Sequence, residues 1–198
     1  HERGQRGGGR LQQVAGIDAR AFVIGPSIRG EVGLDMLQAL AAKGAWVAVD
    51  VQGFVRVTEG NVLRHAPWPE KEAVLAYVDI LKTDAVEAEQ LTGEADIHRA
   101  AQILADLGPA EIVLTHRDGL LVYAQGRYYE AGFYPAQLVG RSGRGDTCLA
   151  SYVARRLDAD LGDATLWAAA VTSLKMETEG PFRRDIQDVH TLLQERYA

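Results

Sequence analysis

The octapeptide GRSGRGDT at residues 140–147 sets the architecture of this chain, because it follows an apolar, strand-like run and opens a segment with the apolar spacing of a helix. Glycines leave backbone N–H groups accessible, and the first turn of a helix adds a partial positive charge. A glycine-rich loop that opens a helix is therefore a cradle for phosphate. Asp146 stands at its end, where a hydroxyl that receives a phosphoryl group needs an acceptor for its proton.

Strand-like and helical segments alternate before this loop. Apolar runs at residues 21–25 and 45–49 flank a helical pattern over residues 31–43, and such a strand–helix–strand unit implies parallel strands. The remaining predicted elements are a helix within 70–77, a strand over 78–81, helices over 84–91 and 96–107, a strand over 111–115, an antiparallel pair over 120–124 and 127–133, and helices over 147–157, 164–177 and 185–197. The pattern predicts an α/β fold, a mainly parallel sheet covered by helices. We expect one domain over residues 1–198, with residues 1–20 irregular or a remnant of a missing N-terminal portion.

Composition excludes several classes of protein. The net charge of -6 disfavours a nucleic-acid partner, which needs a clustered positive field. No apolar run reaches the roughly eighteen residues that a membrane span requires, so we expect no membrane partner. The only cysteine, Cys148, has no partner for an internal disulfide, which fits a reducing compartment and predicts a cytoplasmic protein.

Polar residues follow several of the predicted strands. Asp50 ends one strand, residues 82–84 (KTD) end another, and residues 115–119 (THRDG) follow a third. Ligands of open α/β sheets bind at the carboxyl ends of the strands. We therefore expect these segments and the glycine loop to meet at one site.

Asp84 and Glu87 stand three residues apart at the start of a predicted helix, so both lie on one helical face. Two carboxylates in this arrangement are suited to a hydrated Mg²⁺. The structural alternative is that they are ordinary first-turn acids stabilised by the helix dipole. The glycine loop has an alternative of the same kind: a strand-to-helix connection in which Asp146 caps the helix.

Two motifs together carry a family resemblance. Residues 143–146 read GRGD where ribokinase-like carbohydrate kinases of the PfkB family usually read Gly-Ala-Gly-Asp, and residues 84–87 read DAVE where the family usually reads Asn-x-x-Glu. From about Ala21 to its end, the chain resembles the C-terminal portion of such a kinase. The resemblance implies a ribokinase-like three-layer sandwich with helices on both faces of the sheet. Because the chain starts at His1 rather than Met, we expect it to be part of a longer kinase.

The resemblance also implies an activity: transfer of the γ-phosphoryl group of ATP, with Mg²⁺, to an alcohol of a sugar or related small molecule. Asp146 would be the catalytic base, and Glu87 would order Mg²⁺ through water. The resemblance further implies a homodimer and an anion hole formed by the backbone of Gly143, Arg144 and Gly145. It also implies a nucleotide site lined by Asp84, Thr115, His116 and Gly119.

Each of the two motifs departs from the family pattern at one position. Arg144 replaces the usual alanine, and its guanidinium either touches phosphate or turns to solvent. Asp84 replaces the usual asparagine and adds negative charge near the triphosphate. Two other functions stay open at this point: a nucleotide- or sugar-binding module that has lost catalysis, and a kinase for a vitamin-like hydroxymethyl compound.

Overall fold

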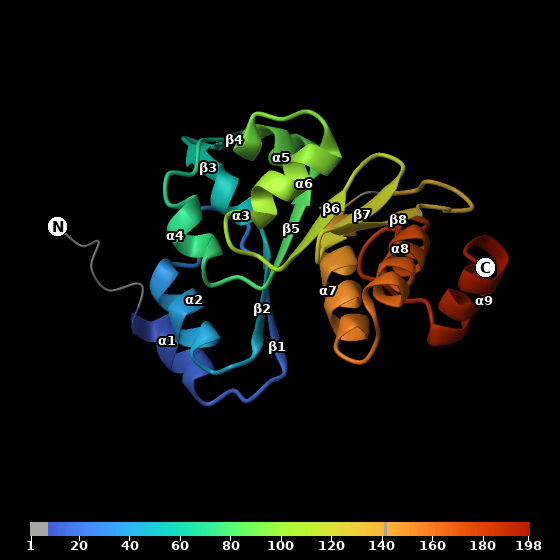
Figure 1. The fold of residues 1–198 in the computed structure, drawn as a ribbon, viewed down its shortest axis with the longest axis horizontal. Coiled ribbons are helices and arrows are strands. Elements are labelled where there is room, and N and C mark those ends of the chain that lie inside the picture. Colours follow the sequence, from blue (N-terminus) through green and yellow to red (C-terminus); the bar gives the residue numbers. More distant parts are fainter. Residues whose placement is uncertain (1–7, 141) are drawn as a thin grey trace.

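A twisted sheet runs through the centre of the computed structural model, which describes residues 8–140 and 142–198 (Figure 1). Its strand order is β1-β2-β5-β6-β7-β8, in which the first four strands are mutually parallel and the last two are antiparallel to their neighbours. The strands are β1 (Ala21–Ile24), β2 (Trp46–Asp50), β5 (Ile80–Asp84), β6 (Glu111–Thr115), β7 (Gly119–Ala124) and β8 (Arg127–Gly132). The mainly parallel sheet is the one that the sequence predicted.

Helices cover both faces of this sheet (Figure 1). One face packs on α2 (Leu34–Ala41), α4 (Lys71–Leu75), α5 (Ala85–Thr92) and α6 (Ile97–Ala105); the other packs on α7 (Arg144–Arg156) and α8 (Leu161–Met176). Successive strand residues point to opposite faces. In β2, for example, Val47 and Val49 belong to the first core and Ala48 to the second. This arrangement confirms three layers, with α9 (Ile186–Arg196) packed outside α8.

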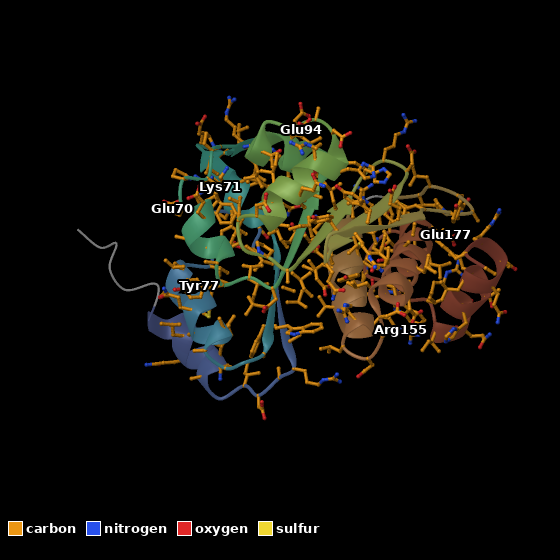
Figure 2. The ribbon with its side chains drawn as sticks, in the orientation of Figure 1. Glu70, Lys71, Tyr77, Glu94, Arg155 and Glu177 are labelled. Carbon is orange, nitrogen blue, oxygen red and sulfur yellow. The ribbon has the colours of Figure 1, made fainter. Side chains whose placement is uncertain are left out.

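Polar contacts join the helices at the surface. Arg155 of α7 bonds Asp163 at the start of α8 at 2.6 Å, and Arg184 bonds Glu177 at the end of α8 at 2.9 Å; Arg155 and Glu177 are labelled in Figure 2. Glu177 also accepts a hydrogen bond from the backbone of Ala136. The segment before the glycine loop is thereby attached to α8. Among the described residues, no helix has the length and hydrophobicity to span a membrane.

Residues 1–20 are not irregular throughout, contrary to the prediction. Helix α1 (Gly8–Ala15) forms there, while residues 1–7 lie outside the described part of the chain. Leu11 and Val14 stand three positions apart, so they share a face and pack against the core beside α2. The ammonium of Lys43 donates to the backbone oxygens of Ala15 and Ile17 at 2.8 and 3.1 Å. These tertiary contacts outweigh the low helix propensity of the glycines.

The strand expected directly before the glycine loop is also absent from the described residues. The backbone N–H groups of Val139 and Gly140 donate to the oxygen of Met176 at the end of α8, at 2.9 and 3.2 Å. Because this segment bonds to a helix end, it does not pair with the sheet. Its apolar residues Leu138 and Val139 remain about half exposed, at 54% and 46%.

A hairpin that the sequence analysis did not predict follows the short helix α3 (Gln52–Val55). Strands β3 (Arg56–Glu59) and β4 (Val62–His65) pair antiparallel around Gly60, which has a φ of 62°. The signal for it is Gly60-Asn61, a two-residue turn sequence between two short β-prone runs. The hairpin begins one residue after α3, next to the carboxyl end of β2.

Gly53 allows α3 to lie directly against the chain that leaves β1. A Cβ at this position would overlap the backbone carbonyl of Pro26 and come within 2.5 Å of the Pro26 side chain. Because backbone atoms cannot move aside cheaply, we expect Gly53→Ala to lower the free energy of unfolding by about 2–4 kcal/mol. Urea unfolding of the full-length protein measures this loss.

Gly16→Ala is the matched control, because nothing lies within 4 Å of a Cβ at that position. We expect it to change the free energy of unfolding by less than about 0.5 kcal/mol. Equal urea midpoints for the two variants would contradict the packing described for α3.

Candidate active site

A polar cleft of about 380 Å³ opens where β2, β5 and β6 end and α7 begins. Asp50, Asp84 and Thr115 are the last residues of those three strands, and all three line it. The cleft is lined by Asp50, Gln52, Arg56, Lys82, Asp84, Thr115, Ser142, Gly143, Arg144, Gly145 and Asp146. The expected meeting of strand ends and glycine loop is therefore present in the structure.

Helix α7 begins at Arg144, three residues earlier than predicted, because Gly143 takes a left-handed conformation with a φ of 73°. Gly143 is the cap of the helix and offers no side-chain bond to the first turn, so Asp146 is not the capping residue. The N–H group of Thr147 already bonds Gly143 at 3.0 Å. The preceding N–H groups of the first turn have no partner within the helix, and N–H groups of this kind are suited to binding an anion.

Asp146 lies in this first turn with its side chain exposed at the cleft. A Cβ placed on Gly25, just after β1, would lie 3.4 Å from its carboxylate oxygen. The carboxylate therefore stands between the end of β1 and the anion-binding turn. It is placed to accept a proton from a hydroxyl that approaches from the β1 side.

A buried ion pair forms the floor of the cleft. Lys82 and Asp50 lie opposite each other in the register of β5 and β2, and their charged atoms are 2.9 Å apart with 5% and 4% of the side chains exposed. Burial by itself lowers the pKa of Lys82, but the attraction of Asp50 and Glu87 outweighs it and raises that pKa overall. Lys82 therefore carries its positive charge at any physiological pH.

Gly145 is the position where α7 approaches this pair most closely. A Cβ on Gly145 would lie 2.6 Å from the ammonium nitrogen of Lys82 and 3.3 Å from the carboxylate of Asp50. The glycine thus brings the positive end of the helix and the positive side chain to one place. The sequence pattern predicts Lys82 at a strand end and gives it no role. The signal for one is a lysine in the strand ILKTD, whose first four residues are all buried.

Asp84 and Glu87 form a reciprocal cap at the start of α5. The Asp84 carboxylate accepts from the N–H of Glu87 at 2.8 Å, and the Glu87 carboxylate accepts from the N–H of Asp84 at 2.9 Å. Glu87 is 1% exposed and does not line the cleft, whereas Asp84 does. The alternative interpretation, in which Asp84 and Glu87 are ordinary acids of a first helical turn, therefore accounts for part of their role.

The cleft offers few side-chain ligands for Mg²⁺. The described residues contain no group of three or more His, Cys, Asp or Glu that could hold a metal. Mg²⁺ commonly binds through one or two carboxylates together with waters and substrate phosphates. Asp84 supplies one such carboxylate at the cleft, and the role expected for Glu87 stays a prediction.

His116 and Gly119 line a different hollow, of about 220 Å³, at the turn between β6 and β7. His116 donates its backbone N–H to Gly119 at 2.9 Å, and burial lowers the pKa of its imidazole. A Cβ on Gly119 would lie 2.5 Å from the backbone oxygen of Ala131, so packing against β8 already requires a glycine. Of the residues expected to contact a nucleotide, the cleft brings together only Asp84 and Thr115.

The pKa of Glu87 makes the stability of the protein depend on pH. Burial raises it from about 4.5 to about 7, with Lys82 opposing and Asp84 adding to the shift. The folded state then binds the proton more tightly than the unfolded state, so stability falls as pH rises from about 4.5 to 7. Glu87→Gln keeps an acceptor for the Asp84 N–H but cannot ionise. We expect this variant to gain about 1–3 kcal/mol relative to wild type between pH 5 and pH 8.

Urea unfolding of the full-length protein at both pH values measures this difference. Glu89→Gln, at an exposed position of the same helix, is the control and should follow the wild-type pH dependence. Parallel pH profiles for wild type and Glu87→Gln would contradict the raised pKa.

Comparison with known proteins identifies the family. The family model for pfkB family carbohydrate kinases matches residues 38–184. A pyrophosphate-dependent myo-inositol-1 kinase, converted by mutation into a myo-inositol-3 kinase, is 38% identical with a TM-score of 0.85, over 95% of this chain and 68% of that chain. A pyrophosphate-dependent kinase in the ribokinase family, solved with a pyrophosphate analogue and myo-inositol, is 39% identical with a TM-score of 0.85, over 91% of this chain and 66% of that chain. A search of curated proteins found no match.

A more distant structure shares the fold. Ribokinase from Arabidopsis thaliana, solved with ribose and ATP, is 24% identical with a TM-score of 0.76, over 94% of this chain and 59% of that chain. The chain thus spans about three fifths to two thirds of the length of these kinases. The ribokinase-like fold expected from the two motifs is confirmed. With the family model covering residues 38–184, the chain belongs to the PfkB family of carbohydrate kinases.

Proposed function

We propose that this chain carries the phosphoryl-transfer site of a kinase that phosphorylates a hydroxyl group of a sugar or cyclic polyol. The observation that carries the proposal is the convergence of three features on one cleft: the exposed carboxylate of Asp146, the first N–H groups of α7, which have no partner within the helix, and the buried cation of Lys82. A carboxylate beside a phosphate cradle serves phosphoryl transfer to a hydroxyl. Similarity to kinases that act on myo-inositol supports a polyol or sugar as acceptor.

In the proposed step, the acceptor oxygen attacks the terminal phosphorus of the donor. The bond from that phosphorus to its bridging oxygen breaks, and the acceptor proton passes to Asp146. The backbone N–H groups of Arg144 and Gly145, with the Lys82 ammonium below them, stabilise negative charge on the transferred group. Mg²⁺, where bound, would be held by Asp84 and donor oxygens and would neutralise phosphate charge.

Pyrophosphate is the donor that we propose. Three kinase structures that are 38–39% identical to this chain are of pyrophosphate-dependent kinases. Among the described residues, three cations line the small cleft: Arg56, Lys82 and Arg144. This concentration of positive charge suits a compact donor whose negative charge lies on its phosphates alone. ATP, expected from the family resemblance, is the competing donor. A homodimer and a cytoplasmic location stay predictions.

The test is a panel of donors and acceptors with the full-length protein. Pyrophosphate or ATP is combined with myo-inositol, ribose or a hydroxymethyl vitamin such as pyridoxine, and phosphorylated product is followed by phosphorus NMR. We expect product that requires the acceptor, formed faster from pyrophosphate than from ATP. Binding of donor by calorimetry without product from any pair would instead favour a module that has lost catalysis. Product from ATP alone would overturn the proposed donor.

A further inference from the structure

We propose that Lys175 is a positioning residue for phosphoryl transfer: its buried ammonium lies under the glycine loop and stabilises an anion bound above the loop. The inference rests on the proposed function and assigns a role in it to a side chain outside the cleft. Lys175 belongs to the last turn of α8 and does not line the cleft. It is only 2% exposed.

The side chain of Lys175 approaches the glycine loop near both of its ends. A Cβ placed on Gly143 would lie 3.6 Å from the last methylene carbon of the lysine. The ammonium donates to the backbone oxygen of Thr178 at 3.3 Å, and a Cβ on Gly140 would lie 3.8 Å from that same oxygen. Because the N–H group of Gly140 also bonds the end of α8, the loop and the lysine share one support.

The charge of Lys175 has no carboxylate partner among the described residues. The carboxylate nearest to it in the sequence, Glu177, pairs with Arg184 at 2.9 Å instead. Burying a charge is costly unless an opposite charge compensates it. Lys82, which approaches the same loop from β5, meets this requirement through Asp50. The ammonium of Lys175 is left with a charge that an anion on the loop would neutralise.

Capping of α8 does not by itself account for this burial. A lysine in the last turn of a helix interacts favourably with the helix dipole and the last carbonyls. Such a lysine usually keeps its ammonium in water, because its flexible stem reaches the surface. Here the ammonium is enclosed between the helix end and the glycine loop. Solvent therefore screens its attraction for an anion at the first turn of α7 only weakly.

The test is Lys175→Met in the full-length protein, which keeps the length of the side chain and removes its charge. We expect pyrophosphate, used without acceptor as the probe, to bind about 10- to 50-fold more weakly by calorimetry, as for loss of one nearby charge. With donor and acceptor present, kcat should fall by a similar factor while KM for the acceptor stays within about threefold of wild type. Urea unfolding should show no loss of stability, because an apolar side chain in place of an uncompensated buried charge is neutral or stabilising.

Lys71→Met is the matched control, because Lys71 also donates to a carbonyl near a helix end, that of Leu91 in α5, at 2.7 Å. Lys71, labelled in Figure 2, lies on α4, across the sheet from α8, and does not line the cleft. We expect this variant to bind pyrophosphate and to turn over as wild type does.

Unchanged pyrophosphate binding in Lys175→Met would overturn the inference. A loss in the free energy of unfolding large enough to explain the lost turnover would overturn it too, since Lys175 would then serve the fold alone. If wild type phosphorylates no acceptor, the proposed function fails, and the inference still stands or falls on whether Lys175→Met weakens pyrophosphate binding. A wild-type protein that binds no pyrophosphate would overturn the inference.

Discussion

Asp146→Asn is expected to lower kcat by about 10²–10⁴-fold, because it removes the group that accepts the hydroxyl proton while keeping the shape of the side chain. The carboxylate is exposed at the cleft, so asparagine removes its charge at a position that already faces solvent. In the first turn of α7 it interacts with the helix dipole, so the loss in the free energy of unfolding should be no more than about 1 kcal/mol. Kinetics with the best donor and acceptor, together with urea unfolding, separate the two effects.

Asp188→Asn is the control for this prediction. Asp188 is also a first-turn acid, of helix α9, and its helix packs on the far side of α8 from the cleft. The same chemical change there should leave kcat unchanged. Turnover of Asp146→Asn within about threefold of wild type would show that the proton goes elsewhere.

Lys82→Met is expected to destabilise the protein by about 3–5 kcal/mol, because it leaves the Asp50 carboxylate buried without its cation. Transfer should be impaired as well, since the floor of the cleft loses its only buried positive charge among the described residues that line it. Arg20→Met, which breaks the exposed pair with Asp158, is the comparison and should cost less than about 1 kcal/mol. Urea unfolding of the full-length protein measures both losses.

The double variant Lys82→Met, Asp50→Asn separates folding from catalysis. Removing both charges together relieves the buried carboxylate, and asparagine can still accept the backbone N–H of Gln52 that Asp50 accepts at 3.0 Å. We expect most of the stability to return while transfer stays impaired. Recovery of wild-type turnover would show that Lys82 serves the fold alone.

The secondary structure of this chain is strongly encoded in local sequence. The buried strands are runs such as WVAVD and EIVLT, and helices such as α6 carry buried apolar residues at helical spacing. The helix over Gly8–Ala15 and the path of the run before the glycine loop differ from the prediction because distant partners decide them: the core beside α2 for one, and the end of α8 for the other. Local patterns do not report such partners.

Local sequence patterns predicted the α/β class, the glycine loop with Asp146, and the acidic pair at the start of α5. Which residues share the cleft depends on how the strands and helices pack. Asp50 and Lys82 meet because β2 and β5 are parallel neighbours in one register, and Gly145 then allows α7 to settle over the pair. The Glu87 side chain bonds within the cap of its own helix, and His116 lines the separate hollow at the turn between β6 and β7. Burial and strand direction decide where each of these two side chains points. Proximity in the cleft follows from strand register and helix packing, which join residues far apart in the chain.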